Sequence, residues 1–264
     1  MIKNARARGF SLLELIGVLA VMGIMAGALA PSVFQLIEDG YADAEVVNLT
    51  TIGDSLRDYV RREKQIPTAA GDEWAREIAA YASLAPERVL RNQKRYKRRY
   101  YVDRRFFENK NKAFKGYTQQ QGLSVRPYSP RIMIVSSLEG EVKANLNKPA
   151  RFDAVWDGAK GARIVESKQV KIERINLAPV FVRVVLNNAS TNQAGYSLEG
   201  GSDNAVAAAA GGADGSRTLY VIADTRLALN AAPYPSGGLL RQLIVKEETS
   251  LRYELAGVNW HWDG

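Results

Sequence analysis

The chain has 264 residues, a formal net charge of +8, no cysteine and a single histidine, His261. Without cysteine no disulfide can stabilise the fold, and a single histidine excludes multi-histidine zinc sites. Its place between Trp260 and Trp262 argues against a His-dependent catalytic triad. No Walker loop or dinucleotide-binding fingerprint occurs, so the sequence favours a non-enzymatic protein without a cofactor.

The N-terminus combines a basic leader with a long apolar run. Residues 1–9 contain three basic side chains and end in Gly9, and no charged residue occurs from Leu15 to Ile37. These 23 residues exceed the roughly 20 that a membrane-spanning helix needs. Because basic flanks tend to stay in the cytoplasm, we predict a single-pass protein whose C-terminal part is extracytoplasmic.

Two simpler interpretations of this segment stay open. A secretory signal peptide also has a basic start and an apolar middle, and Ala28-Leu29-Ala30 offers a small-x-small cleavage site. However, Pro31 follows that site directly and Glu14 opens the apolar run. A plain single-span anchor would treat Glu14 as an incidental residue near the membrane interface.

The residues around Gly9 resemble the cleavage and methylation signature of type IV pilins and type II secretion pseudopilins. Gly9 precedes the scissile bond, Phe10 follows it, and Glu14 is the fifth residue of the mature chain. The resemblance implies that a prepilin peptidase removes residues 1–9 and that the new Phe10 amine is methylated. It also implies a place in the bacterial inner membrane, and assembly with other pilin or pseudopilin subunits into a periplasmic or surface filament.

Glu14 is the residue that most needs a physical explanation. A carboxylate in hydrocarbon is unfavourable by a few kcal/mol or more at the bilayer centre, and such residues are usually paired and functional. Glu14 lies about 6 Å along a helix from Phe10, so the amine of its own chain is held away from it. We therefore predict that Glu14 pairs with the Phe10 amine of a neighbouring subunit and controls assembly.

The same helix contains a glycine-rich segment that ends in proline. Gly23 and Gly27 form a small-residue packing motif. Pro31 has no N–H, so the carbonyl of Gly27 loses its helical partner. This pattern predicts a bend or local unwinding at Gly27 and Pro31, although both residue types are also common in membrane helices.

Beyond Pro31 the pattern becomes amphipathic. Leu49, Ile52, Leu56 and Tyr59 recur at spacings of three and four, with charged residues on the other faces. We therefore expect one helix to about Arg62. The predicted organisation is a leader (1–9), a transmembrane and assembly helix (10–37), its amphipathic continuation (38–64) and an extracytoplasmic globular head (65–264).

The head is predicted to be α+β. Trp74, Ile78 and Tyr81 form a helical stripe, and Pro86 can begin a second short helix. Segments typical of strands follow, and helices followed by strands favour an antiparallel sheet. Residues 149–156 are ambiguous between strand and short helix, and residues 200–215 are expected to form a surface loop. The predicted strands are 131–136, 170–176, 180–187, 219–224, 240–246 and 250–255.

The basic charge is concentrated in one segment. Residues 91–115 contain eleven basic and two acidic residues, a net charge of +9, and the leader carries three more positive charges, which leaves −4 for the rest of the chain. Aromatic residues interleave with these charges, a combination that can bind single-stranded nucleic acid. The segment is therefore a candidate site for DNA or another polyanion, and the proposed contacts are Arg95, Lys97, Arg98, Arg99, Arg104 and Arg105.

A simpler interpretation of the basic segment is purely structural. Tyr100, Val102 and Phe106 fit an alternation in which the aromatics face the core while the charges are solvated or meet acidic neighbours. We favour this interpretation over nucleic-acid binding. An anionic envelope polymer or an acidic exported substrate are further candidate partners.

The resemblance also narrows the kind of subunit. Many major type IV pilins have a disulfide-closed loop, which this chain lacks, and this favours a type II secretion pseudopilin. The major pseudopilin is usually shorter than this chain and binds calcium. Asp203, Asn204 and Asp214 could offer oxygen ligands to calcium here. Acids in a Gly/Ala-rich loop, however, are more often only solvated. The tip pseudopilin typically lacks the glutamate that Glu14 provides. A minor structural subunit of a secretion or pilus system is therefore expected, with a pilin-like polyanion-binding protein as the alternative.

Overall fold

The computed structural model describes residues 12–67, 71–109, 112–113, 122–254 and 259–262. The chain divides into two compact units, residues 1–44 and 45–264, and each is described by itself. Helix α1 (Leu12–Glu63) runs through the division as one unbroken helix, as its apolar and then amphipathic pattern predicts. Its bounds agree with the predicted end near Arg62.

In the first unit, α1 exposes almost every apolar side chain. Leu13 is 82% exposed, Ile24 74% and Leu36 73%. In the part of the chain that the structure describes, α1 alone is long and apolar enough to cross a membrane, and the apolar stretch that meets this criterion is not buried by the protein. An apolar surface of this length requires lipid or another protein to cover it.

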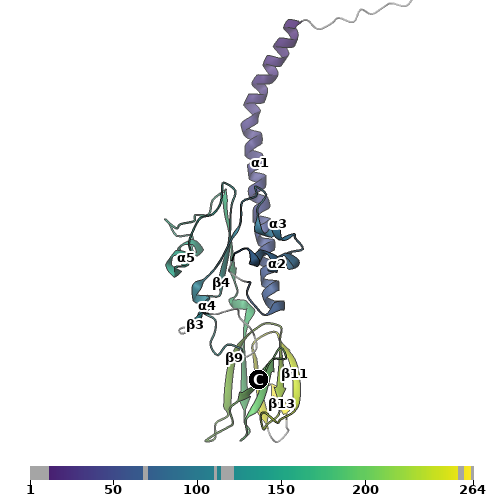
Figure 1. Ribbon diagram of the computed structural model, residues 1–264, viewed down its shortest axis with the longest axis vertical. Helices are drawn as coiled ribbons and strands as arrows, with labels where there is room; N and C mark the ends of the chain where they lie inside the picture. The colour runs from purple at the N-terminus through teal and green to yellow at the C-terminus, as the bar shows by residue number, and fades with distance from the viewer. Residues whose placement is uncertain (1–11, 68–70, 110–111, 114–121, 255–258, 263–264) are drawn as a thin grey trace, which may run out of the picture. The chain divides into compact units, whose positions relative to one another are not determined.

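The second half of α1 forms the centre of a helical core. Leu49, Ile52, Leu56 and Val60 are at most 2% exposed and recur at helical spacing. They pack in one cluster with α2 (Glu73–Ala82) and α3 (Pro86–Leu90), the two short helices expected at Trp74 and Pro86. Figure 1 shows α2 and α3 beside this half of α1.

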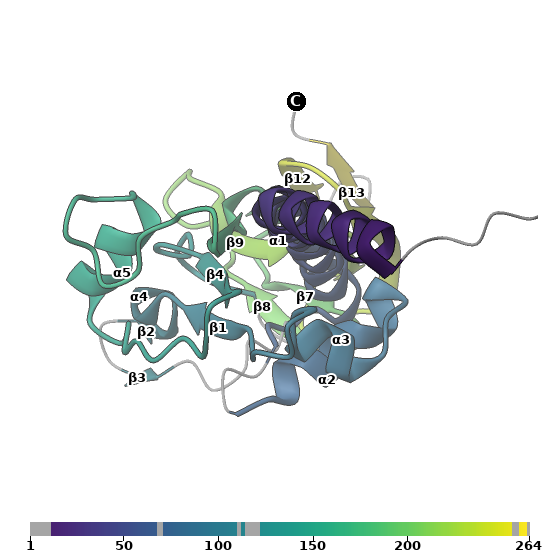
Figure 2. The same cartoon turned by 90° about the horizontal axis from the view of Figure 1, so that it is seen from above.

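A three-stranded antiparallel sheet covers this core. It has the order β1-β4-β5, from β1 (Arg99–Val102), β4 (Arg131–Ser137) and β5 (Val170–Asn176). Alternate residues of β4 serve the two faces: Ile132 and Ile134 join the helical core, whereas Met133 and Val135 pack under α5 (Pro149–Trp156). The β4 strand is thus buried on both faces, and Figures 1 and 2 both show α5 beside it.

Short elements follow β1. They are α4 (Arg104–Phe107) and the two-stranded pair of β2 (Glu108–Asn109) and β3 (Lys112–Ala113). A 3-10 turn, η1 (Ala178–Val180), leads from β5 into the C-terminal part of the head. Lys64, the residue that follows α1, contacts the C-terminal part of the head. Its ammonium donates a hydrogen bond of 2.7 Å to the carbonyl of Ala223.

The C-terminal part is a sandwich of two four-stranded sheets around a single apolar cluster that both sheets supply. One has the order β13-β12-β6-β9, from β6 (Phe181–Asn188), β9 (Gly215–Ile222), β12 (Thr249–Glu254) and β13 (Asn259–Trp262). The other has the order β11-β10-β7-β8, from β7 (Ala194–Leu198), β8 (Asn204–Val206), β10 (Thr225–Asn230) and β11 (Leu239–Val245). All pairs in both sheets are antiparallel except β6 with β12, which is parallel.

The α+β class is confirmed, but the head contains several sheets where one was expected. The ambiguous segment 149–156 is the helix α5, begun by Pro149 at a first-turn position. The expected loop 200–215 contains β8 and ends at the start of β9. Gly215 is needed there, because an added Cβ would lie 1.9 Å from the carbonyl oxygen of Ala207. Close backbone approach, and not flexibility, explains that glycine.

Candidate functional site

The N-terminal cassette lies at the start of α1. Gly9 and Phe10 lie outside the described residues, so their cleavage and methylation stay predictions. Glu14 lies in the first turn of α1, where the positive end of the helix dipole favours a carboxylate. The helix passes through Gly27 and Pro31 without a break, so the local unwinding predicted there is not found, and the bend stays a prediction.

The glycines of α1 leave space on its surface. A Cβ added at Gly17, Gly23 or Gly27 would meet no atom within 4 Å apart from the adjacent residues and the nearby backbone of α1 itself. Close packing therefore does not require glycine there within the described chain. Small residues at such spacing let a second helix approach closely in a membrane, so these positions are suited to contact with a partner.

Arg98, one of the predicted polyanion contacts, is instead an internal residue. It is 2% exposed, and its Nε and Nη2 donate to the two carboxylate oxygens of Glu45 on α1 at 2.6 and 2.7 Å. Its Nη1 donates to the carbonyls of Arg88, Val89 and Arg91 at 2.6, 3.0 and 2.8 Å. A guanidinium bonded in this way cannot reach a surface ligand, so its assignment to polyanion binding is corrected.

The other predicted contacts differ in their surroundings. Lys97 forms an ion pair of 2.7 Å with Asp72, and the exposed Arg99 donates to the carbonyl of Val142 at 3.2 Å. Arg95 and Arg104 are exposed. The structure therefore does not gather these cations on one continuous surface of free charge, and several of them meet acidic neighbours as the structural interpretation expects.

Three aromatic residues of this segment, Tyr100, Tyr101 and Phe106, pack against the core. Phe106 is 5% exposed and contacts Phe181 edge to face, with ring centroids 6.0 Å apart. Tyr100 stacks on Trp74 with centroids 5.2 Å apart. These rings are not free to stack on bases, which confirms the structural interpretation for Tyr100 and Phe106.

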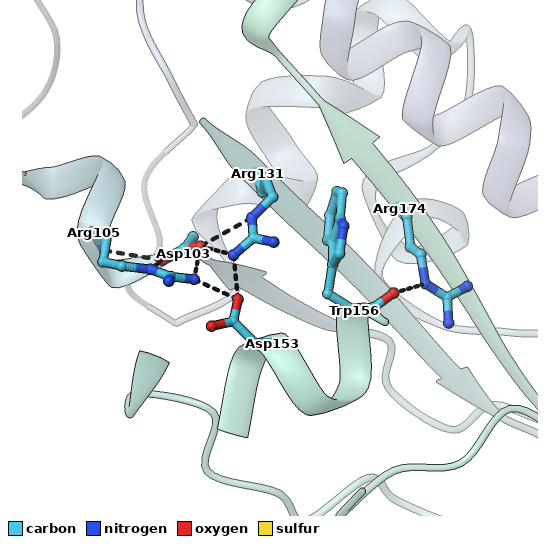
Figure 3. Close-up of polar contacts among 6 residues, drawn as sticks. All are labelled: Asp103, Arg105, Arg131, Asp153, Trp156 and Arg174. Atoms are coloured by element: carbon cyan, nitrogen blue, oxygen red, sulfur yellow. Dashed lines mark hydrogen bonds and ion pairs between the residues drawn. The ribbon is translucent and has the colours of Figure 1, made fainter. Parts of the chain in front are cut away.

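Arg105 belongs to a cluster of two arginines and two aspartates (Figure 3). Asp103 is fully buried and accepts bonds of 3.0 and 2.8 Å from the Arg105 guanidinium and of 3.1 and 2.7 Å from that of Arg131. Asp153 on α5 accepts from Arg105 at 2.5 Å and also from Arg131. The cluster is electrically balanced and joins α4, β4 and α5, so it is a structural tie between these elements.

Aromatic rings complete this cluster. The Arg131 guanidinium lies over the rings of Phe152 and Trp156, 5.4 and 5.0 Å from their centroids. The carbonyl of Trp156 accepts a bond of 2.8 Å from Arg174 on β5 (Figure 3). Cation–π contact and hydrogen bonding therefore hold α5 against both β4 and β5.

The cluster makes the stability of the head depend on pH. The hydrogen bond from Arg105, with a further one from Arg131, holds the pKa of Asp153 below its usual 3.8, although partial burial acts in the opposite direction. A lowered pKa in the folded state means that the unfolded chain binds more protons in this range, so stability falls as the pH falls below about 4. We expect Asp153→Asn to be less stable than wild type at neutral pH. Its free energy of unfolding should also fall less than that of wild type when the pH is lowered.

Thermal unfolding at neutral pH and at about pH 3 measures this difference. Asp157→Asn is the matched control, because Asp157 is an exposed carboxylate at the C-terminal end of the same helix. The control should show the acid sensitivity of wild type. An Asp153→Asn protein with unchanged acid sensitivity would contradict the assignment.

Comparison with known proteins decides the interpretation of the N-terminus. Residues 4–30 match the prokaryotic N-terminal methylation motif. The chain carries the prepilin-type signature of type IV pilin-like proteins. The signature supports a pilin-like or pseudopilin subunit that is a prepilin peptidase substrate and assembles with other subunits, and such structural subunits are usually non-enzymatic. No curated protein matches the sequence.

The remaining sequence candidates lie apart from the cluster of Asp103, Arg105, Arg131 and Asp153. Asp214 forms an ion pair of 3.1 Å with Arg252, Asn204 lies on β8, and the carbonyl of Asp203 accepts a bond from Tyr234. His261, the single histidine, lies on β13, and its side chain is 46% exposed.

The sequence analysis did not predict the acidic partners of the arginines in the head. Glu45 precedes Arg98 by 53 residues, and Asp153 follows Arg105 by 48. Charge patterning along a chain detects partners three or four positions apart on a helix, so it gives no signal for pairs at these separations.

Proposed function

We propose that the chain is a non-enzymatic pseudopilin or minor pilin, which polymerises through its N-terminal helix in a type II secretion or type IV pilus system. The observation that carries the proposal is the methylation motif of residues 4–30, whose described part, residues 12–30, lies on an exposed apolar helix. The leader stays in the cytoplasm, and the head lies outside the inner membrane. Extraction of the helix into a periplasmic or surface filament buries its apolar surface.

The composition supports the assignment to a minor subunit. The chain has no cysteine, so it lacks the disulfide-closed loop of many major pilins, and 264 residues exceed the usual length of a major pseudopilin. Glu14 is present, unlike in the usual tip pseudopilin. These three features together fit a minor, lower-abundance subunit.

Mass spectrometry of the N-terminus tests the proposal directly. In cells with a working prepilin peptidase we expect a mature chain that begins at Phe10 and carries one added methyl group on its amine. In cells without the peptidase we expect the intact leader from Met1. Recovery of the intact leader from cells that process other prepilins would contradict the proposal.

Two glycine variants separate processing from general effects on the helix. Gly9→Leu should retain the leader, because the residue before the scissile bond is changed. Gly17→Leu is the matched control, since this glycine has open space around it and lies beyond the cleavage site. It should be processed as wild type.

The alternative function, polyanion capture by the basic segment, has less support than the sequence suggests. Arg98 is buried against Glu45, Lys97 is paired with Asp72, and Arg105 is paired with two aspartates. Of the predicted contacts that remain exposed, Arg95 belongs to another arrangement, which centres on α3 and the turn after it.

A further inference from the structure

A cavity of about 910 Å³ opens beside α3 and is lined by arginines. Arg88 comes from α3, Arg91 and Arg95 come from the turn after it, and Arg98 lies at the base of the turn. The lining includes one carboxylate, Glu87. A concave surface of this size is typical of small-ligand sites.

The turn that carries these arginines is held rigidly. Asn92 is 5% exposed, and its amide nitrogen donates to Ser136 Oγ and to the carbonyl of Ser137 at 3.1 and 2.7 Å. Its side-chain oxygen accepts the backbone N–H of Tyr96 at 3.0 Å. Arg95 adopts a left-handed φ of 66° and gives its carbonyl to the Arg91 guanidinium at 2.9 Å. The arginine turn is therefore anchored to β4.

Arg98 fixes the other side of the cavity. Its Nη1 binds the carbonyls of Arg88, Val89 and Arg91, which are the backbone positions from which two of the lining arginines project. Glu45 neutralises Arg98 itself. The buried pair thus holds the cavity backbone in place, while the charge offered to a ligand comes from Arg88, Arg91 and Arg95.

The charge balance of the lining favours an anion. Arg91 pairs with Glu87 at 3.1 Å, and the Glu87 side chain is 74% exposed, so a ligand in water can compete for this arginine. In the described part of the chain, Arg88 and Arg95 form no ion pair with a carboxylate. The guanidinium fork matches the oxygen geometry of carboxylate and phosphate groups.

The remaining lining defines the ligand further. Asn48, Gln93 and Asn92 add amide groups, and Leu84 is the apolar contribution. The lining includes no aromatic residue, so the cavity lacks the stacking surface that single-stranded nucleic acids use. We propose that this cavity is a binding site for a small polar ligand bearing clustered oxyanions, either phosphates or carboxylates, with Arg88, Arg91 and Arg95 as the contacts. The proposal does not depend on filament assembly.

Isothermal titration calorimetry of the full chain in non-ionic detergent at low ionic strength tests the site, with pyrophosphate and citrate as probes. Arg88→Gln/Arg95→Gln removes the two exposed arginines without touching the anchors of the turn. We expect this double variant to bind at least about tenfold more weakly, because charge-assisted hydrogen bonds are lost. Arg126→Gln/Arg163→Gln is the matched control, since both arginines are exposed and lie outside the lining.

Glu87→Gln provides the opposite test. This change frees Arg91 from its competing carboxylate, so we expect tighter binding of the probe, an effect that simple loss of structure would not produce. If only pyrophosphate binds, the ligand of the site is a phosphate; if only citrate binds, it is a carboxylate. Three results would overturn the proposal. They are no binding of either probe, equal weakening in both double variants, and weaker binding by Glu87→Gln. Preferential binding of oligothymidylate overturns it in favour of a nucleic-acid groove.

Discussion

Replacing Glu45 with alanine is expected to lower the free energy of unfolding of the head by about 3–5 kcal/mol. The change leaves the Arg98 guanidinium charged, 2% exposed and without its counter-ion. Water cannot replace the lost carboxylate unless the packing between α1 and α3 opens. Removal of one partner of a buried ion pair is therefore far more damaging than removal of an exposed one.

The measurement is chemical unfolding followed by tryptophan fluorescence. All four tryptophans lie beyond residue 64, so the signal reports the head and not the membrane helix. Glu73→Ala is the matched control, because Glu73 forms an exposed pair with Arg76 and its side chain is 56% exposed. Its loss should be below about 1 kcal/mol. A loss of that size for Glu45→Ala would contradict the structural role of the pair.

A double variant, Glu45→Ala/Arg98→Ala, distinguishes the two parts of the arrangement. It removes the unpaired charge, but it also takes the donor away from three backbone carbonyls. We expect it to remain less stable than wild type, because buried carbonyls without donors are themselves unfavourable. The pair therefore orders the turn after α3 as well as joining that turn to α1.

The parts of the fold that the sequence predicts are those with strong periodicity. The strand at Val170–Asn176 has the expected bounds, and α1 ends within a residue of the expected position. In α1, apolar residues recur at the spacing that the helix imposes. In β5, Val170 and Ile172 pack on one face of the sheet and Ile175 on the other. The long helix is also where composition, pattern and the family signature agree.

The strands that were missed are rich in small and polar residues. β7 has the sequence Ala-Gly-Tyr-Ser-Leu, and every residue in it is buried. β10 contains alanine and asparagine and lies between two other strands. Small and polar residues have little intrinsic preference for strands, and here burial between neighbours decides their conformation. Tertiary context of this kind cannot be read from a local segment.

The basic segment shows the same limit for electrostatics. The sequence gives the number of charges in residues 91–115, but the structure decides which of them face a carboxylate. Two of the predicted contacts, Arg98 and Arg105, are bound by acids more than 45 positions away. Arg88, which the basic segment does not include, lines the cavity with Arg91 and Arg95. A surface patch is therefore a property of the fold and not of the local charge density.

Replacing Glu14 with alanine is expected to abolish entry into a filament while membrane insertion stays normal. The apolar run from Leu15 to Ile37 is unchanged in this variant, so the helix still partitions into the membrane. What it loses is the carboxylate that we propose to pair with the Phe10 amine of the next subunit. A charge-assisted contact contributes about 1.5–3 kcal/mol, which corresponds to a tenfold to hundredfold change in each association step. Repeated along a polymer, this change prevents stable incorporation.

Sheared or purified filaments, compared with the membrane fraction by immunoblotting, measure the effect. Glu14→Gln removes the charge but keeps the shape, so it should fail as Glu14→Ala does if charge pairing is the cause. Glu38→Ala is the matched control on the same helix, because Glu38 lies just outside the apolar run and water can solvate its carboxylate. Normal incorporation of both Glu14 variants would show that the exposed apolar surface alone assembles the helix. If the two Glu14 variants stay out of the filament while Glu38→Ala enters it, assembly depends on the intramembrane acid. The rest of α1 would then supply only the surface on which subunits pack.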